Sequence, residues 1–386
     1  MTSLLNDLND AQREAVTTTD GPLLVLAGAG SGKTRVITRR AAHLASTVTQ
    51  PRHILAITFT NKAAGEMRER MEALGFGREM TVCTFHSLGA RLLRWYAPQA
   101  GLKPNFTIFD ESDRRSVIKQ AIADAGLSTT NWVPAKVQAD ISDAKTRLLT
   151  PEKYAAEASG LSFTEQTIAR VYNIYQKLLG QQQAVDFDDL LLKTALLLGD
   201  NPDLRTHLED RFRYVLIDEY QDTNHMQYMI ARGLTLKNEN ICATGDPDQS
   251  IYAWRGASIR NILEFEHDFP TAKVVRLEQN YRSTKRILSA AGSLIQSNSQ
   301  RKKKDLWTEN DLGATVRVVE REEPEDEADF LVEEIKAHVQ SGGSLNEIAV
   351  FYRTNALTRI IEEAFLRAGI SYQIARGTEF YNRKEI

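Results

Sequence analysis

The sequence predicts an α/β fold in which helices cover both faces of a parallel sheet. Three observations lead to this prediction. Short apolar, β-branched runs alternate with helix-like segments along most of the chain. The first of these runs leads directly into a glycine-rich turn and then a helix. Two later runs lead directly into acidic residues, as buried parallel strands can do at the edge of a sheet.

The composition is that of an ordinary globular protein of more than one domain. A chain of 386 residues is long enough for two or three domains. Apolar residues make up 42% and charged residues 26%, and the net charge is −3. Any nucleic-acid binding must therefore use a local basic groove or base stacking, because bulk charge does not favour it.

Cys83 and Cys242 are the two cysteines of the sequence, and both lie in apolar, strand-like stretches. We expect buried free thiols in a reducing compartment, in preference to a disulfide. No apolar run has the length of a membrane helix, and the N-terminus lacks a signal-peptide core. These features predict a cytoplasmic protein with no membrane partner.

The elements follow one another in a regular order. A helix capped by Asn61 runs to about Met71. Between about 90 and 185 the chain reads as a helical insertion, with helices over 111–125, 135–145 and 165–179. The strands predicted for the sheet are residues 22–26, 53–60, 81–85, 214–217, 240–244 and 273–277.

A second α/β unit is predicted to begin at about residue 277. Its expected strands are 315–319, 348–352 and 370–374. The acidic run 320–329 reads as a solvated loop and helix start. The basic run Arg301–Lys304 either contacts phosphates or forms an exposed turn, and the sequence leaves both open.

The glycine-rich turn has the chemistry of a phosphate site. Glycines let backbone N–H groups approach phosphate oxygens, and the helix that follows points its positive end at the same anion. Lys33 can reach the β- and γ-phosphates, and the Thr34 hydroxyl can ligate Mg²⁺. A ligand-free turn is the weaker alternative, because Gly-Lys-Thr opens a helix. The predicted loop is Ala27, Gly28, Ala29, Gly30, Ser31, Gly32, Lys33 and Thr34.

Asp218 and Glu219 end an apolar strand and could complete such a site. Asp218 can hold Mg²⁺, and Glu219 can orient and deprotonate the attacking water. A polar exit to solvent is the alternative for the pair taken alone. Gln249 follows the next strand, and we expect it near the γ-phosphate if the two strands are neighbours.

Tyr252, Trp254 and Arg255 come directly after Gln249. Aromatic faces stack on any base, and arginine binds phosphate or stacks as well. Taken alone, the two aromatic residues would be read as core residues. A phosphate contact and a stacking surface lie in the same short segment. We therefore favour a coupling between the bound nucleotide and the affinity for nucleic acid.

Together these motifs resemble those of the superfamily 1A DNA helicases of the UvrD/Rep/PcrA type, over essentially all 386 residues. The resemblance implies P-loop NTPase (RecA-like) domains, with ATP and Mg²⁺ as cofactors. In that family, Ala is the usual residue at the position of Ala27. By resemblance, Gln12 reads the adenine edge, Arg35 packs near the base, Tyr281 stacks on adenine and Arg282 is an arginine finger.

The resemblance also implies a track for single-stranded DNA. Segments 58–64 and 84–87 line it in the family, and Phe187 helps to form a base pocket. A strand of the second domain would add Arg353. The predicted DNA-binding residues are therefore Phe59, Asn61, His86, Phe187, Tyr252, Trp254, Arg255 and Arg353.

The domain organisation follows from the same resemblance. Residues 1–90 and 186–276 would form domain 1A with the ATP site, and 91–185 the inserted domain 1B. Residues 277–386 would form the first part of domain 2A. The family's motifs V and VI are missing from the sequence, so we expect a truncated portion of a longer motor.

The expected function is an ATP-dependent 3′→5′ DNA helicase or translocase on single-stranded DNA and its junctions with duplex, in repair or replication. Glu219, Gln249, Arg282 and Lys33 would carry the hydrolysis. One alternative is a translocase that displaces proteins without processive unwinding. Another is a catalytically silent DNA- and nucleotide-binding fragment, and a P-loop kinase is weaker still. Repair or replication proteins fit as partners, but the sequence names none.

Overall fold

The computed structural model describes residues 4–76, 78–158, 160 and 162–374. The chain divides into two compact units, Met1–Ala314 and Thr315–Ile386. Each unit is described by itself.

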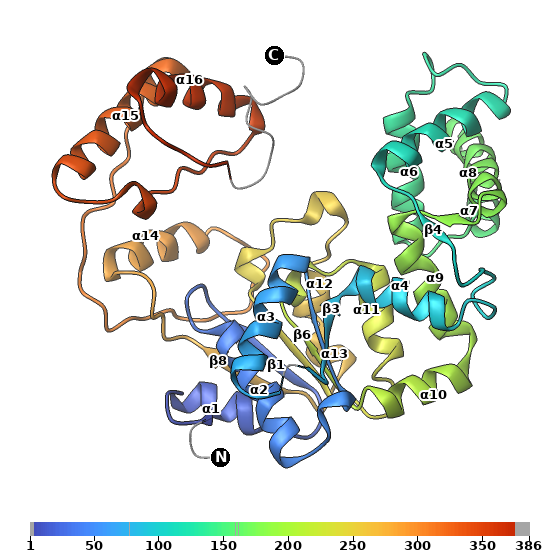
Figure 1. Ribbon diagram of the computed structural model, residues 1–386, viewed down its shortest axis with the longest axis horizontal. Helices are drawn as coiled ribbons and strands as arrows, with labels where there is room; N and C mark the ends of the chain where they lie inside the picture. Colours follow the sequence, from blue (N-terminus) through green and yellow to red (C-terminus); the bar gives the residue numbers. More distant parts are fainter. Residues whose placement is uncertain (1–3, 77, 159, 161, 375–386) are drawn as a thin grey trace. The chain divides into compact units, whose positions relative to one another are not determined.

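A six-stranded sheet forms the centre of the first unit (Figure 1), in the order β3-β2-β6-β7-β1-β8. Every neighbouring pair is parallel. The six strands lie within two residues of their predicted ends, which confirms the α/β fold with a parallel sheet. Their bounds are β1 Leu23–Ala27, β2 Ile54–Thr58, β3 Thr81–Thr84, β6 Tyr214–Ile217, β7 Ile241–Gly245 and β8 Lys273–Leu277.

Helices cover the two faces of this sheet because alternate strand residues enter different cores. In β1, Leu24 and Leu26 belong to one core and Leu23 and Val25 to the other. The Leu23 face packs on α1 (Asp10–Thr17), α2 (Lys33–Thr47) and α3 (Asn61–Ala73). The Leu24 face packs on α4 (Phe85–Trp95), α9 (Phe187–Asp200), α10 (Pro202–Arg211), α11 (His225–Gly233), α12 (Arg260–Leu263) and α13 (Phe265–Asp268).

The start of α3 differs by one residue from the prediction. Thr60, in extended conformation, is the N-cap, and its side chain accepts a hydrogen bond from the Ala63 N–H. Asn61 is the first helical residue. A threonine hydroxyl can accept a hydrogen bond from a free N–H of the first turn, and Thr60 does so here.

The predicted helical insertion forms a bundle with its own core (Figure 1). A parallel two-stranded ladder, β4 (Thr107–Ile108) with β5 (Ala184–Val185), joins the two ends of the inserted chain. The helices between them are α5 Glu111–Asp124, α6 Pro134–Thr146, α7 Pro151–Ala158 and α8 Phe163–Gln181.

Short helices fill the remaining connections of the first unit. They are η2 Pro51–His53, η3 Tyr220–Asp222, η4 Pro247–Gln249, η5 Ala253–Arg255 and α14 Lys285–Ile295. Cys83 and Cys242 are buried free thiols, as predicted. None of the helices in the described ranges combines the length and apolar character needed to cross a bilayer.

The second unit contains α15 (Pro324–Gln340) and α16 (Thr358–Ala368), with η6 (Leu345–Glu347) and η7 (Asn355–Leu357). The three strands predicted here are wrong for the described residues, because 315–319, 348–352 and 370–374 have no strand pairing. Val318 is 97% exposed and Phe351 92%. A strand persists when a neighbour satisfies its backbone groups, and no described segment pairs with these three.

Candidate functional site

The glycine-rich loop connects β1 to α2 and has the backbone of a phosphate cradle. Gly30 and Gly32 have φ of +66° and +89°, in the left-handed region that favours glycine. A Cβ on Gly30 would lie 2.7 Å from Cβ of Arg282. Arg282 therefore packs so closely against the loop that a side chain at position 30 would clash with it. Gly32 is the N-cap of α2 and gives it no side-chain cap, which leaves backbone N–H groups to meet an anion.

Lys33 and Glu219 form an ion pair across the sheet edge, with 2.7 Å between Nζ and Oε2. Glu219 has φ of +52°, a strained value for a residue with a side chain. The amide nitrogen of Gln221 donates to Glu219 at 2.9 Å, and its amide oxygen accepts from the Asp246 N–H at 3.0 Å. Glu219 is therefore held in place from two directions.

Asp218 directly follows β6 and is buried, with its N–H donating to the Ile57 carbonyl at 2.8 Å. Burial and the nearby Glu219 carboxylate raise the pKa of Asp218 to about 6, although the Lys33 ammonium opposes the shift. A buried carboxylate of this kind is well suited to a cation. The parallel sheet brings it to the same edge as Thr34, the second predicted Mg²⁺ ligand.

The segment after β8 closes over the glycine-rich loop. Asn280 is buried; its amide nitrogen donates to the Ala29 carbonyl at 2.6 Å, and its amide oxygen accepts from Arg282 N–H at 2.8 Å. The Tyr281 N–H donates to the Gly30 carbonyl at 3.0 Å. The predicted loop residues and the predicted Tyr281 and Arg282 are thus in one place.

Gln12 also contacts the loop, because its amide nitrogen donates to the Ser31 carbonyl at 2.9 Å. Its neighbour Asn9 donates to the Tyr281 hydroxyl at 2.9 Å. Arg35 is exposed, and its guanidinium donates to the Asp7 carbonyl at 3.3 Å. The start of α1 therefore contacts both the loop, through Gln12, and Tyr281, through Asn9.

Gln249 lies in η4 and shares a cavity of about 750 Å³ with Ala29 of the loop. β6 and β7 are neighbours in the sheet, which was the condition for placing Gln249 near a γ-phosphate. The amide nitrogen of Gln249 hydrogen-bonds to the Asp246 carboxylate. Its side chain is therefore oriented by a fixed partner.

Aromatic side chains form two pairs at the ends of the strands. Phe59 and Tyr252 are stacked with ring centroids 4.9 Å apart, and Trp254 lies 6.4 Å from Tyr252. Trp254 is 69% exposed, so the alternative that it is a core residue is wrong. His86 and Phe187 form the second pair, 5.7 Å apart, with Phe187 51% exposed.

Three further predicted contacts stand apart from these pairs. Asn61 accepts a hydrogen bond from the Ser87 hydroxyl at 3.5 Å, beside His86. Arg353 is exposed in the second unit. The side chain of Arg255 lies outside the described part of the chain.

The comparison with protein families agrees with this arrangement. Residues 8–270 match the UvrD/REP helicase N-terminal domain, and residues 275–386 match the UvrD-like helicase C-terminal domain. The chain belongs to the UvrD/REP helicase family.

Three bacterial relatives are each called ATP-dependent DNA helicase PcrA. The chain is 48% identical over 387 residues to that of Bacillus subtilis, a match covering 99% of this chain and 52% of the relative. It is 47% identical over 390 residues to that of Staphylococcus epidermidis, covering 100% and 53%. It is 46% identical over 389 residues to that of Staphylococcus aureus, a match covering 100% of this chain and 53% of the relative. The chain spans about half the length of these relatives.

In this UvrD/REP family chain, some residues that support the site were not predicted from the sequence. Their side chains hydrogen-bond to the predicted site residues and fix their positions. Asn280 and Gln221 are examples: both lie within segments that carry the family resemblance, 277–284 and 216–222, but neither was assigned a role. Lys304 is another: its ammonium contacts Asp246 and lies 2.9 Å from Asp248. Because Lys304 is buried, the expectation of an exposed turn is wrong for this residue. Arg301 pairs with Asp248 at 3.1 Å.

Proposed function

We propose that this chain is part of an ATP-dependent motor that moves 3′→5′ along single-stranded DNA, as a helicase or translocase in repair or replication. The observation that carries the proposal is the Lys33–Glu219 pair at the mouth of a glycine-rich loop, with exposed aromatic rings on neighbouring strand ends. The names of the relatives support the same activity. A cytoplasmic location fits a protein that acts on chromosomal DNA.

The residues of the loop fit a nucleoside triphosphate with Mg²⁺. The left-handed glycines offer N–H groups to phosphates, and the buried carboxyl of Asp218 favours a cation. When bound, Mg²⁺ held by Thr34 and Asp218 supplies positive charge to the β- and γ-phosphates. Glu219 would accept the proton of the attacking water, and Gln249 would orient that water or sense the phosphate.

The remaining nucleotide roles belong to the residues around the base and the outer phosphate. Gln12 and Tyr281 would hold the adenine, with Arg35 near its edge. Arg282 would approach the γ-phosphate, where an arginine finger is worth about 10³–10⁵ in rate. Asn280 connects this segment to the loop, so nucleotide state and the position of Arg282 would change together.

DNA would bind along the exposed rings. Stacking on Trp254, Tyr252, Phe59 and Phe187 would tolerate any sequence, at about 1–3 kcal/mol per base. Asn61, His86, Arg255 and Arg353 would add polar contacts to the strand, so binding should weaken as salt rises.

The proposal retains the division into domains 1A (1–90 and 186–276), 1B (91–185) and the first part of 2A (277–386). ATP would lie between 1A and 2A, and closing and opening of that site would move bases past the rings.

The test is DNA-dependent ATP hydrolysis. We expect single-stranded DNA to stimulate phosphate release by the protein, and Lys33→Ala to abolish turnover while DNA binding persists. Lys119→Ala is the matched control, because Lys119 is exposed on α5 and has no role in the proposed sites. Unchanged turnover in Lys33→Ala would contradict the site. Displacement of bound protein without strand separation would favour the translocase over the helicase.

A further inference from the structure

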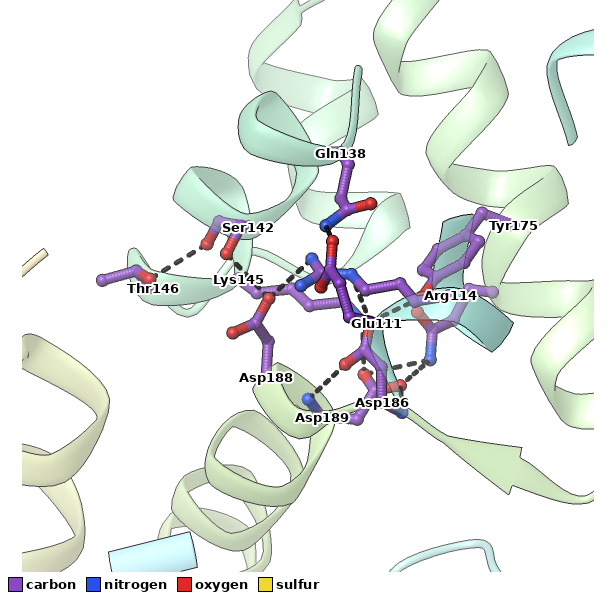
Figure 2. A network of polar contacts seen from close by, with 11 residues as sticks. Glu111, Arg114, Gln138, Ser142, Lys145, Thr146, Tyr175, Asp186, Asp188 and Asp189 are labelled. Carbon is purple, nitrogen blue, oxygen red and sulfur yellow. Dashed lines mark hydrogen bonds and ion pairs between the residues drawn. The ribbon is translucent and has the colours of Figure 1, made fainter. Parts of the chain in front are cut away.

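A buried cluster of charged residues joins the helical insertion to the start of α9 (Figure 2). Lys145 of α6 lies at its centre, with Nζ 2.8 Å from Asp186 Oδ2 and 2.8 Å from Asp189 Oδ1. All three side chains are 0% exposed. Tyr175 of α8 donates its hydroxyl proton to Asp186 at 2.7 Å. Two helices of the insertion therefore bind one carboxylate.

Asp188 is held by the insertion as well. The Arg114 guanidinium of α5 lies 2.7 Å from Asp188 Oδ2, and the Ser142 hydroxyl of α6 donates to the same oxygen at 2.7 Å. Arg114 also lies 3.5 Å from Asp186. The cluster thus combines two cations with three carboxylates, and every carboxylate belongs to the first turn of α9 or its cap.

These carboxylates determine how α9 begins. Asp186 is the N-cap: its side chain accepts from the Asp189 N–H at 2.7 Å, and Asp189 accepts in return from the Asp186 N–H at 3.3 Å. Phe187 is the first helical residue, between the capping Asp186 and Asp188. Its ring is half exposed and lies against His86 of α4. The backbone that carries this ring is therefore fixed on both sides by ion pairs.

Ion pairs buried to this degree are a poor source of stability, because desolvation of the charges offsets their attraction. Their geometry is specific, however, since a displaced partner leaves a buried charge uncompensated. A cluster of this kind is best suited to holding one orientation. The feature it holds here is the exposed aromatic ring at the end of the sheet.

We propose that Lys145 is a positioning residue for nucleic-acid binding: through Asp186 and Asp189 it fixes the start of α9, and so the orientation in which Phe187 stacks on a base. The inference rests on the proposed function, because it requires a single strand on this face. It also links the insertion to the binding site, since its helices α5, α6 and α8 supply the partners of the three carboxylates.

The test uses single-stranded DNA containing 2-aminopurine, whose fluorescence is quenched on stacking. We expect Lys145→Met to weaken DNA binding about fivefold or more and to reduce the quenching, because one stacked base is worth at least that factor. The ATP concentration for half-maximal turnover should not change. Lys136→Met is the matched control, because Lys136 is exposed on the same helix and should bind DNA as wild type does.

A double-mutant cycle separates positioning from general damage. Phe187→Leu removes the ring, so adding Lys145→Met to that variant should cost nothing further. An equal loss of affinity in both backgrounds would overturn the inference, as would unchanged binding and quenching in Lys145→Met. If the wild-type protein itself shows no quenching, the proposed function fails instead.

Lys145→Met leaves Asp189 without its cation and Asp186 with only the Arg114 guanidinium at 3.5 Å, and it could unfold the bundle. Thermal unfolding of each variant identifies that case. Tyr175→Phe then carries the test, because it removes one hydroxyl hydrogen bond to Asp186 and keeps the ring. We expect a loss of about twofold in DNA affinity that disappears in the Phe187→Leu background. A loss that persists there, or no loss in either background, would overturn the inference.

Discussion

The Lys33 ammonium and the Glu219 carboxylate share an ion pair of 2.7 Å, and the Glu219 backbone is strained at φ of +52°. One residue is the predicted phosphate ligand and the other the predicted base. Each therefore contributes to the electrostatic environment of the other.

Glu219→Gln should separate hydrolysis from binding. The amide keeps the size of the side chain but cannot accept the proton of water, so we expect turnover to fall about 10²-fold or more. Nucleotide affinity should stay within about twofold of wild type, because Lys33 remains. Single-turnover phosphate release and titration with a fluorescent nucleotide measure the two quantities. Glu66→Gln, at an exposed position of α3, is the control, and wild-type turnover in Glu219→Gln would contradict the role of the base.

Asp218→Asn should stabilise the protein above pH 6. The pKa of Asp218 is raised to about 6 from its ordinary 3.8, by burial first and by Glu219 second. Between these values the native state binds more protons than the unfolded state, so its stability falls as the pH rises. Above pH 6 the ionised Asp218 lowers the free energy of unfolding by its full amount, about 3 kcal/mol.

Thermal unfolding at several pH values measures this effect. Asn cannot ionise, so the midpoint of Asp218→Asn should exceed that of wild type at pH 7.5. The difference should disappear near pH 4. A difference that is the same at both pH values would mean that Asp218 does not titrate in this range.

Trp254→Ala should weaken binding of single-stranded DNA by about fivefold or more, because the exposed ring offers a stacking surface. Nucleotide affinity should be unchanged. Fluorescence anisotropy of labelled DNA measures the first quantity, and nucleotide titration the second. Trp95→Ala is the matched control, since Trp95 is 46% exposed at the end of α4 and contacts the Arg211 guanidinium. Equal affinity in wild type and Trp254→Ala would exclude this ring from the DNA site.

Asn280→Ala should weaken nucleotide binding about tenfold. The amide of Asn280 holds the Ala29 carbonyl and the N–H groups of Arg282 and Ser283, at 2.6, 2.8 and 2.7 Å. Its loss leaves these groups without a partner, at about 1–3 kcal/mol for each one that stays buried. Nucleotide titration and thermal unfolding measure the two effects, with the exposed Asn346→Ala as control. Wild-type nucleotide affinity would show that the segment does not form the site.

The sheet of the first unit could be predicted because its strands are buried on both faces. A run such as Leu23–Ala27 is apolar at every position, and the glycines, lysine and threonine that follow it are typical of a phosphate-binding loop. Those local signals predicted the loop, Asp218, Glu219 and the exposed Trp254. The strand prediction at 315–319 used the same signal, but strand pairing depends on residues elsewhere in the chain.

The contacts that hold the site could not be predicted from local sequence. Lys145 and Asp186 lie 41 residues apart, and the fold of the insertion brings them together. Asn280 and Ala29 lie 251 residues apart, and they meet because β8 pairs with β1. The tertiary arrangement of helices and strands determines such pairs, and the hydrophobic pattern of the sequence does not specify that arrangement.

The ladder of Thr107–Ile108 with Ala184–Val185 has a practical consequence. The chain leaves and re-enters at adjacent strands, which are about 4.8 Å apart in any sheet. Residues between them could therefore be excised only with a linker long enough to run back along the ladder, because the two strands are parallel. The bundle is in this sense a detachable module, and a protein lacking it would retain the phosphate loop with Phe187 released from its charged anchor.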